Sequence, residues 1–266
     1  MKVLALDSSG LVASVALIED GVLLGEYSTN FHKTHSTTLL PMLDELMRML
    51  SLDIRDAGID AIAVAKGPGS FTGLRIGAAT AKGLAFVLGV PIVPVSTLAG
   101  LAYNLWGTDS IVCPLMDARR NQTYTAIYRF ADQVTDTEER SAGHPADPHI
   151  PDRERRLKQE TLVEPCAVDI SEIVQKINDR KDKVIFLGDG VPVFADYIRE
   201  HCVVPYCFAP AHANRQRAAS VGALAMTLMA EKNEIAIPSD QFAPDYLRLS
   251  QAERERIEKE TAERTG

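Results

Sequence analysis

Cysteine and positive charge are both scarce in this chain of 266 residues. Its four cysteines, at positions 113, 166, 202 and 207, fall well short of the density of a disulfide framework. Lysine and arginine number 28 against 36 aspartates and glutamates, which gives a net charge of −8. Because extensive nucleic-acid surfaces are usually basic, this balance argues against a self-sufficient one. The thiols are expected to be reduced, as in the cytoplasm.

Long apolar runs are the second absence. We expect no membrane-spanning segment, and the apolar start at residues 3–6 stops at Asp7, which is too short for a signal peptide. What is present is ordinary: 46% hydrophobic and 24% charged residues are typical of a globular protein with ample core. The length suggests one large domain or two of medium size.

The stretch from residue 62 to residue 88 organises the chain. Residues 62–65 are apolar and partly β-branched, which predicts a buried strand, and the following Gly67-Pro68-Gly69 predicts a turn. A helical pattern starts at Gly73, with Ser70 or Thr72 as its expected cap. The loop either offers free N–H groups to a phosphate or a partner, or only connects strand to helix; the loop alone favours the second interpretation.

The predicted helix 73–88 carries small residues at Gly73, Gly77 and Ala81, four positions apart. Glycine inside a helix costs about 1 kcal/mol against alanine, so these positions need a reason. Small side chains at this spacing leave a smooth stripe that another helix or backbone can approach closely.

A second helix is predicted over residues 37–50, and it is apolar around most of its circumference. Leucines 39, 43, 46 and 50 form one seam, while Leu40 and three methionines lie off it. A helix of this kind is buried on more than one side. Either it is enclosed by its own domain, or its extra face meets another chain, for which methionine is an adaptable contact residue.

The order of the predicted elements indicates two halves. Strands at 2–6, 13–19 and 22–27 precede the two helices, and further strands are expected at 62–65 and 90–95. The second half repeats this order in weaker form, so we expect α/β architecture with two βββαβαβ-type subdomains and mixed sheets. The expected boundaries are 1–105 and 106–217, with an irregular insertion at about 131–161, a helix at 218–232 that packs back on the first subdomain, and a charged tail at 250–266.

Two groups of potential metal ligands are weak candidates. His32 and His35 have no carboxylate or cysteine nearby, so an exposed or capping role is expected. The group at positions 201, 202, 207 and 212 fits no usual zinc spacing, and packing explains it better. Residues 69–73 only loosely resemble a nucleophile elbow, and no His–Asp pair joins them.

Four short segments together resemble one family: Asp7-Ser8-Ser9, the loop 66–77 (KGPGSFTGLRIG), the strand end 95–98, and residues 244–248 (PDYLR). They are similar to the YeaZ (TsaB) family of bacterial threonylcarbamoyladenosine tRNA-modification proteins, close over 1–105 and looser over 106–232. The resemblance implies a duplicated RNase H-like (ASKHA) fold, the architecture of actin and hexokinase.

The resemblance also implies the absence of chemistry. The catalytic relative, TsaD, carries an Asn-His-x-x-x-His motif after the corresponding strand, whose two histidines bind a metal. Here Thr97 and Leu101 stand at those positions, and neither provides a ligand. No catalytic residue and no metal site are therefore expected.

The implied function is that of a non-catalytic scaffold or activator. The chain would join TsaD and the ATPase TsaE to place threonylcarbamoyl on N6 of adenosine 37 in tRNAs that read ANN codons. It would contact tRNA only within that complex and would form a homodimer when alone. The alternative is an ASKHA-fold ATPase or a metal-dependent glycopeptidase that acts alone. The expected partner interface comprises Leu39, Leu40, Leu43, Met47, Phe71, Thr72, Gly73, Leu74, Arg75, Ile76, Gly77, Thr80 and Ala81.

Nucleotide binding is a weaker expectation. In the ASKHA fold the first hairpin of each half cradles phosphates, which implies a degenerate nucleotide site at Asp7, Ser8, Ser9, Asp117, Gly188 and Asp189. ATP or ADP is expected only in the complex, and no resident cofactor is expected. Arg75 opposes the dipole in the first turn of its helix, so it is expected to serve an ion pair, either within the chain or across an interface.

Overall fold

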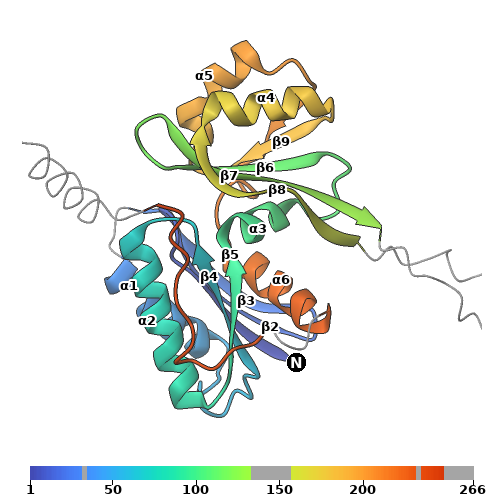
Figure 1. Ribbon diagram of the computed structural model, residues 1–266. Coiled ribbons are helices and arrows are strands. Elements are labelled where there is room, and N and C mark those ends of the chain that lie inside the picture. Colours follow the sequence, from blue (N-terminus) through green and yellow to red (C-terminus); the bar gives the residue numbers. More distant parts are fainter. Residues whose placement is uncertain (32–34, 133–156, 232–234, 249–266) are drawn as a thin grey trace, which may run out of the picture.

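Two five-stranded sheets dominate the computed structural model (Figure 1). In the first half, three antiparallel strands are followed by two helix-linked parallel strands, and the sheet order is β3-β2-β1-β4-β5. The elements are β1 Lys2–Asp7, β2 Ala13–Glu19, β3 Val22–Thr29, α1 His35–Met49, β4 Ala61–Gly67, α2 Phe71–Leu88 and β5 Ile92–Ser96. The structure describes residues 1–31, 35–132, 157–231 and 235–248.

The second half repeats this topology. Its sheet order is β10-β9-β6-β7-β8. Read from β8 to β10, this order matches the first sheet read from β3 to β5, with the same parallel and antiparallel pairings. The predicted duplication with mixed sheets is therefore confirmed. The elements are β6 Ile111–Asp117, β7 Gln122–Asp132, β8 Leu157–Asp169, α4 Ile170–Arg180, β9 Val184–Leu187, α5 Val191–His201 and β10 Tyr206–Phe208.

The two halves exchange their covering helices. Helix α3 (Thr97–Ala102) follows the first sheet, yet Leu98 and Leu101 pack against Val112 and Tyr128 of the second. Helix α6 (Ala218–Glu231) follows the second sheet but packs on the first. In Figure 1 both helices lie between the sheets. The second half is therefore covered by α3, which precedes it in the chain, and the first half is covered by α6, which follows the second half.

The two faces of the first sheet differ in the size of their side chains. On β1 the small or β-branched Val3 and Ala5 point to α6, whose Gly222 permits close approach to Ala5. The larger Leu4 and Leu6 point to the opposite face, where α1 and α2 lie side by side (Figure 1). This alternation follows from the two-residue period of a strand. Helices α1 and α2 therefore form the outer layer of this half.

Helix α2 is long and apolar enough to cross a membrane by length and composition alone, so the expectation that no segment approaches a span needs correction. In this fold the helix packs on the first sheet, with Leu74, Ala78, Ala81 and Ala85 buried. The apolar character of α2 reflects this packing on one side only, because Phe86 and Val87 are exposed on the other.

A strap, residues 235–248, returns over the first half. Its Ile237 pairs with Ile92 of β5, and Lys82 of α2 donates to the carbonyl oxygen of Phe242 at 3.0 Å. Arg248 then donates to the carbonyl oxygen of Ala118 in the second half at 2.6 Å. The strap thus connects the outer layer of the first half to the β6–β7 turn.

The expected irregular insertion at 131–161 is partly wrong. Residues 131, 132 and 157–161 belong to β7 and β8, which pair from Asp132 and Leu157 onward. The edge strand β8 is polar over residues 158–161 and contains Pro165, so its sequence shows no regular apolar pattern there. Its pairing depends on backbone hydrogen bonds to β7. Residues 133–156, and the predicted tail at 250–266, lie outside the described residues.

Candidate functional site

The glycine-rich loop is held against the end of β1. The amide of Ser70 donates to the carbonyl oxygen of Ser9 at 2.7 Å, and the Ser70 hydroxyl caps α2 by accepting from the amide of Gly73. The hydroxyl of Ser8 donates to the carbonyl oxygen of Gly73 at 2.9 Å. The connection is therefore a tight one, built around the Asp7-Ser8-Ser9 segment.

The small stripe of α2 faces this segment rather than a partner. A methyl group on Gly73 would overlap the Ser8 carbonyl oxygen, and one on Gly77 would lie 2.6 Å from the Ser8 hydroxyl oxygen. Ala81 is buried in the same layer. The prediction that this stripe receives a partner helix is therefore wrong for Gly73, Gly77 and Ala81, because their own chain already occupies the space.

Other members of the expected interface are also enclosed. Four of them are buried side chains: Leu39, Leu43 and Met47 in the core under α1, and Leu74 on α2. Phe71, Ile76 and Thr80 are half-buried, whereas Leu40, Thr72 and Arg75 are exposed. The outer surface also exposes residues that the sequence analysis did not select, namely Met49 of α1 and Phe86 and Val87 of α2.

We call the exposed side of these two helices the outer face, defined by Leu40, Met49, Thr72, Arg75, Phe86 and Val87. Beside it, an open groove of about 450 Å³ runs along α1. Its floor contains Leu40 and Met47, and residues 52–54 form its other side. Large apolar side chains that stay exposed on neighbouring helices are typical of a contact surface.

Arg75 makes an aromatic contact, and within the described residues it forms no ion pair; an ion pair across an interface stays a prediction. Its guanidinium lies 4.0 Å from the centroid of the Phe71 ring, and its Nε donates to the Tyr246 hydroxyl at 3.4 Å. Tyr246 of the strap also packs on Phe71, with ring centroids 4.6 Å apart. The strap therefore completes the N-terminal end of the outer face.

Asp7 is the buried acid of the first half. The Ser9 amide and hydroxyl both donate to its Oδ1, at 2.8 and 2.6 Å. Burial nevertheless raises the pKa of Asp7 to about 6, against the lowering effect of those hydrogen bonds and of His35. His35 itself donates to the Gly10 carbonyl oxygen at 2.8 Å, which agrees with a structural role, whereas His32 lies outside the described residues.

The acids of the second half form a separate group. Asp117, at the end of β6, accepts from the amide of Arg119 at 2.8 Å and pairs with its guanidinium. Asp189 follows Gly188 after β9; burial raises the pKa of its carboxyl, and both Asp117 and Arg215 act on it electrostatically. The expected nucleotide residues thus lie at corresponding ends of the two sheets, one group on each half.

The two positions at which TsaD would carry metal-binding histidines hold a hydroxyl and an apolar side chain in this chain. Thr97 and Leu101 lie one turn apart on α3, both buried. Among the described residues, no three His, Cys, Asp or Glu side chains are grouped closely enough to hold a metal ion. The candidates 201 and 212 are separate: His201 stacks on Tyr197, and His212 lines a cavity beside β3.

Comparisons with known proteins match this fold. The family model described as "TsaD: tRNA N6-adenosine threonylcarbamoyltransferase" matches residues 26–256. The tRNA threonylcarbamoyladenosine biosynthesis protein TsaB of Bacillus subtilis is 29% identical over 97% of this chain and 99% of its own length. That of Haemophilus influenzae is 38% identical, over 47% of this chain and 52% of its own length.

Solved structures give the same result. YeaZ from Pseudomonas aeruginosa is 27% identical, with a TM-score of 0.64 over 92% of this chain and 99% of that one. A second Pseudomonas aeruginosa structure, described as similar to peptidase YEAZ, has a TM-score of 0.69 at 24% identity over 93% and 99% of the two chains, and supports the fold. The fold is the duplicated, ASKHA-like α/β architecture. The chain therefore belongs to the TsaD family and, within it, to the TsaB (YeaZ) group of tRNA threonylcarbamoyladenosine biosynthesis proteins.

Proposed function

We propose that this protein is a non-catalytic scaffold and activator in the installation of threonylcarbamoyl on N6 of adenosine 37 of tRNAs that read ANN codons. It works in the cytoplasm with TsaD, the catalytic relative, and with the ATPase TsaE. ATP or ADP binds in that assembly, and tRNA is contacted only there. Family membership supports the pathway; the division of labour is our proposal.

The outer face of α1 and α2 carries this proposal. Phe86 is 81% exposed and lies beside exposed Val87, although side chains of this size gain free energy when they are covered. The inner sides of the same helices are already buried in the core. A partner that covers the outer face would remove this apolar surface from water, as protein–protein contacts commonly do.

The positions of Thr97 and Leu101 support the non-catalytic part. Both side chains are buried, Leu101 against the second sheet, so a metal ion bound there would need ligands that these residues do not offer. TsaD would then supply the catalytic residues, and this chain would stabilise the arrangement in which TsaD is active.

The experiment compares two exposed apolar residues of the same accessibility. Phe86→Glu changes the outer face, whereas Val203→Glu changes a residue that is 80% exposed in the second half, after α5. We expect the first variant to lose at least about tenfold of its affinity for TsaD in a co-elution or titration assay, and the second to bind as wild type. Both should retain the wild-type circular dichroism. Wild-type capture of TsaD by Phe86→Glu would overturn the proposed face.

The same face is proposed to join two copies of this chain when TsaD is absent. Sedimentation of the wild type should then show a dimer, and Phe86→Glu should sediment as a monomer. Adding TsaD should replace the homodimer by the mixed pair, because one surface cannot bind both partners at once.

A further inference from the structure

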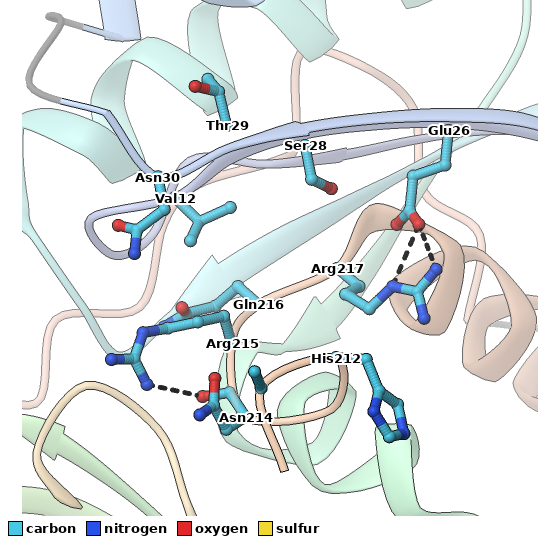
Figure 2. A pocket seen from close by; sticks show the side chains of 11 residues that line it. Val12, Glu26, Ser28, Thr29, Asn30, His212, Asn214, Arg215, Gln216 and Arg217 are labelled. Carbon is cyan, nitrogen blue, oxygen red and sulfur yellow. Dashed lines mark hydrogen bonds and ion pairs between the residues drawn. The ribbon is translucent and has the colours of Figure 1, made fainter.

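A cavity of about 620 Å³ lies between the end of β3 and the segment that leads into α6 (Figure 2), and none of its lining residues belongs to the outer face. It is lined by Val12, by the end of β3 with Asn30, and by residues of the segment 211–217. This volume is in the range of pockets that hold small organic ligands. No role proposed above uses it.

Gln216 is the least satisfied residue of this cavity. Its side chain is 1% exposed, yet neither the amide oxygen nor the amide nitrogen has a hydrogen-bond partner in the described part of the chain. The amide is held in place by close packing, because a methyl group on Gly10 would lie 2.6 Å from Nε2. Leaving a buried polar group unpaired costs about 1–3 kcal/mol, so these atoms require a partner from the cavity that they line.

Arg215 adds a positive charge at the same end. Its Nη1 donates to the carbonyl oxygens of Gly188 and Asn214, at 3.0 and 2.9 Å, which fixes the guanidinium. Its Nε is buried and lacks a hydrogen-bond partner within the described residues. Figure 2 shows Arg215 and Gln216 together at one end of the cavity.

The acid of the cavity is already neutralised. Glu26 accepts from Nε of Arg217 at 3.0 Å and from its Nη2, and its other oxygen accepts from the amide of Ala219 at 3.0 Å. This pair lies at the opposite end from Arg215 (Figure 2). Asp189 acts on Arg215 electrostatically, and its Oδ1 has no hydrogen-bond partner within the described residues. The described lining of the cavity therefore leaves the Arg215 guanidinium without an ion pair, although the nearby Asp189 carboxyl acts on it electrostatically.

We propose that this cavity binds a small organic anion, whose carboxylate or phosphate group pairs with Arg215 and whose polar body hydrogen-bonds to Gln216. A guanidinium is suited to both oxyanions, and a glutamine amide offers one donor side and one acceptor side. An inorganic ion would fill only a small part of the volume, whereas an organic anion reaches both residues. The proposal is independent of the partnership with TsaD.

Isothermal titration of the full chain with two probes tests this site. AMP offers a phosphate ester and a base edge, and N-acetylglutamate offers carboxylates and an amide. We expect at least one probe to bind, and the one that binds identifies the preferred oxyanion. Gln216→Leu and Asn30→Asp should each weaken binding by at least about tenfold, the first by removing the amide and the second by placing a negative charge at the rim.

Matched controls separate this site from general effects. Gln175→Leu removes an exposed glutamine amide on α4 and should leave the affinity unchanged. Asn30 is exposed, so Asn30→Asp should fold even if Gln216→Leu does not. Failure of both probes to bind at millimolar concentration, or binding that is equal in wild type and Asn30→Asp, would overturn the proposal.

Discussion

The Ser8 hydroxyl donates to the carbonyl oxygen of Gly73 across 2.9 Å and thereby ties the first turn of α2 to the end of β1. Both residues are buried, and the two backbones approach so closely that no side chain fits on Gly73. The glycine is therefore required by contacts inside the chain. This relationship explains the small stripe that the sequence displays so clearly.

Gly73→Ala should destabilise the protein, whereas Gly83→Ala should not. The added methyl group at residue 73 would overlap the Ser8 carbonyl oxygen, and overpacking of this kind costs about 1–3 kcal/mol. Gly83 lies in the same helix with open space around its Cα, so alanine there should stabilise by about 1 kcal/mol. Urea unfolding of the two variants measures both effects. Equal stability of the two variants would contradict the close contact with Ser8.

The buried carboxyl of Asp7 should make stability depend on pH. Its pKa is raised from 3.8 to about 6 in the folded protein, so the folded state binds the proton more tightly than the unfolded state does. Stability should consequently fall as the pH rises from about 4 to about 6 and then level off. The shift corresponds to about 3 kcal/mol between these limits.

Asp7→Asn tests this dependence. The amide cannot ionise, but its oxygen can still accept from Ser9. We expect the variant to gain up to about 3 kcal/mol relative to wild type when the comparison moves from pH 4 to pH 7. Urea unfolding at the two pH values gives this double difference. The same difference at both values would mean that Asp7 titrates near its ordinary pKa.

The purified chain alone should neither hold stoichiometric metal nor hydrolyse ATP. Thr97 and Leu101 offer no metal ligand where the catalytic relative would carry histidines. Elemental analysis of the purified protein and a phosphate-release assay measure the two properties. Metal at one equivalent, or turnover that an Asp7→Asn variant abolishes, would favour the alternative of an enzyme that acts alone.

Local patterns in the sequence predicted much of the fold. The strands of the first half have apolar runs and an Asp20-Gly21 turn, and α1 and α2 have helical periodicity, so their order was readable. Strand β8 was missed because an edge strand with polar residues and a proline is held by its neighbour's backbone. The residue pattern of β8 alone therefore does not indicate that it pairs with β7.

The site was harder to predict for the same reason. The sequence indicated that α2 has a smooth stripe, but Ser8, which occupies it, lies 65 residues earlier in the chain. It also assigned Leu43 and Met47 to a partner interface, although both side chains are buried in the core of the first half. Gln216 and Arg215 belong to no recognisable motif, and their lack of partners became visible only in three dimensions.

The exchange of α3 and α6 has a consequence for synthesis on the ribosome. When the first hundred residues have emerged, the alanine-rich side of the first sheet is still bare, since residues 218–231, which cover it, form the last helix or strand within the described residues. The first half therefore cannot be completed until α6 has emerged, whereas residues 97–208 already contain the second half together with α3. We expect the first sheet to reach its native packing last, in a step that requires nearly the whole chain.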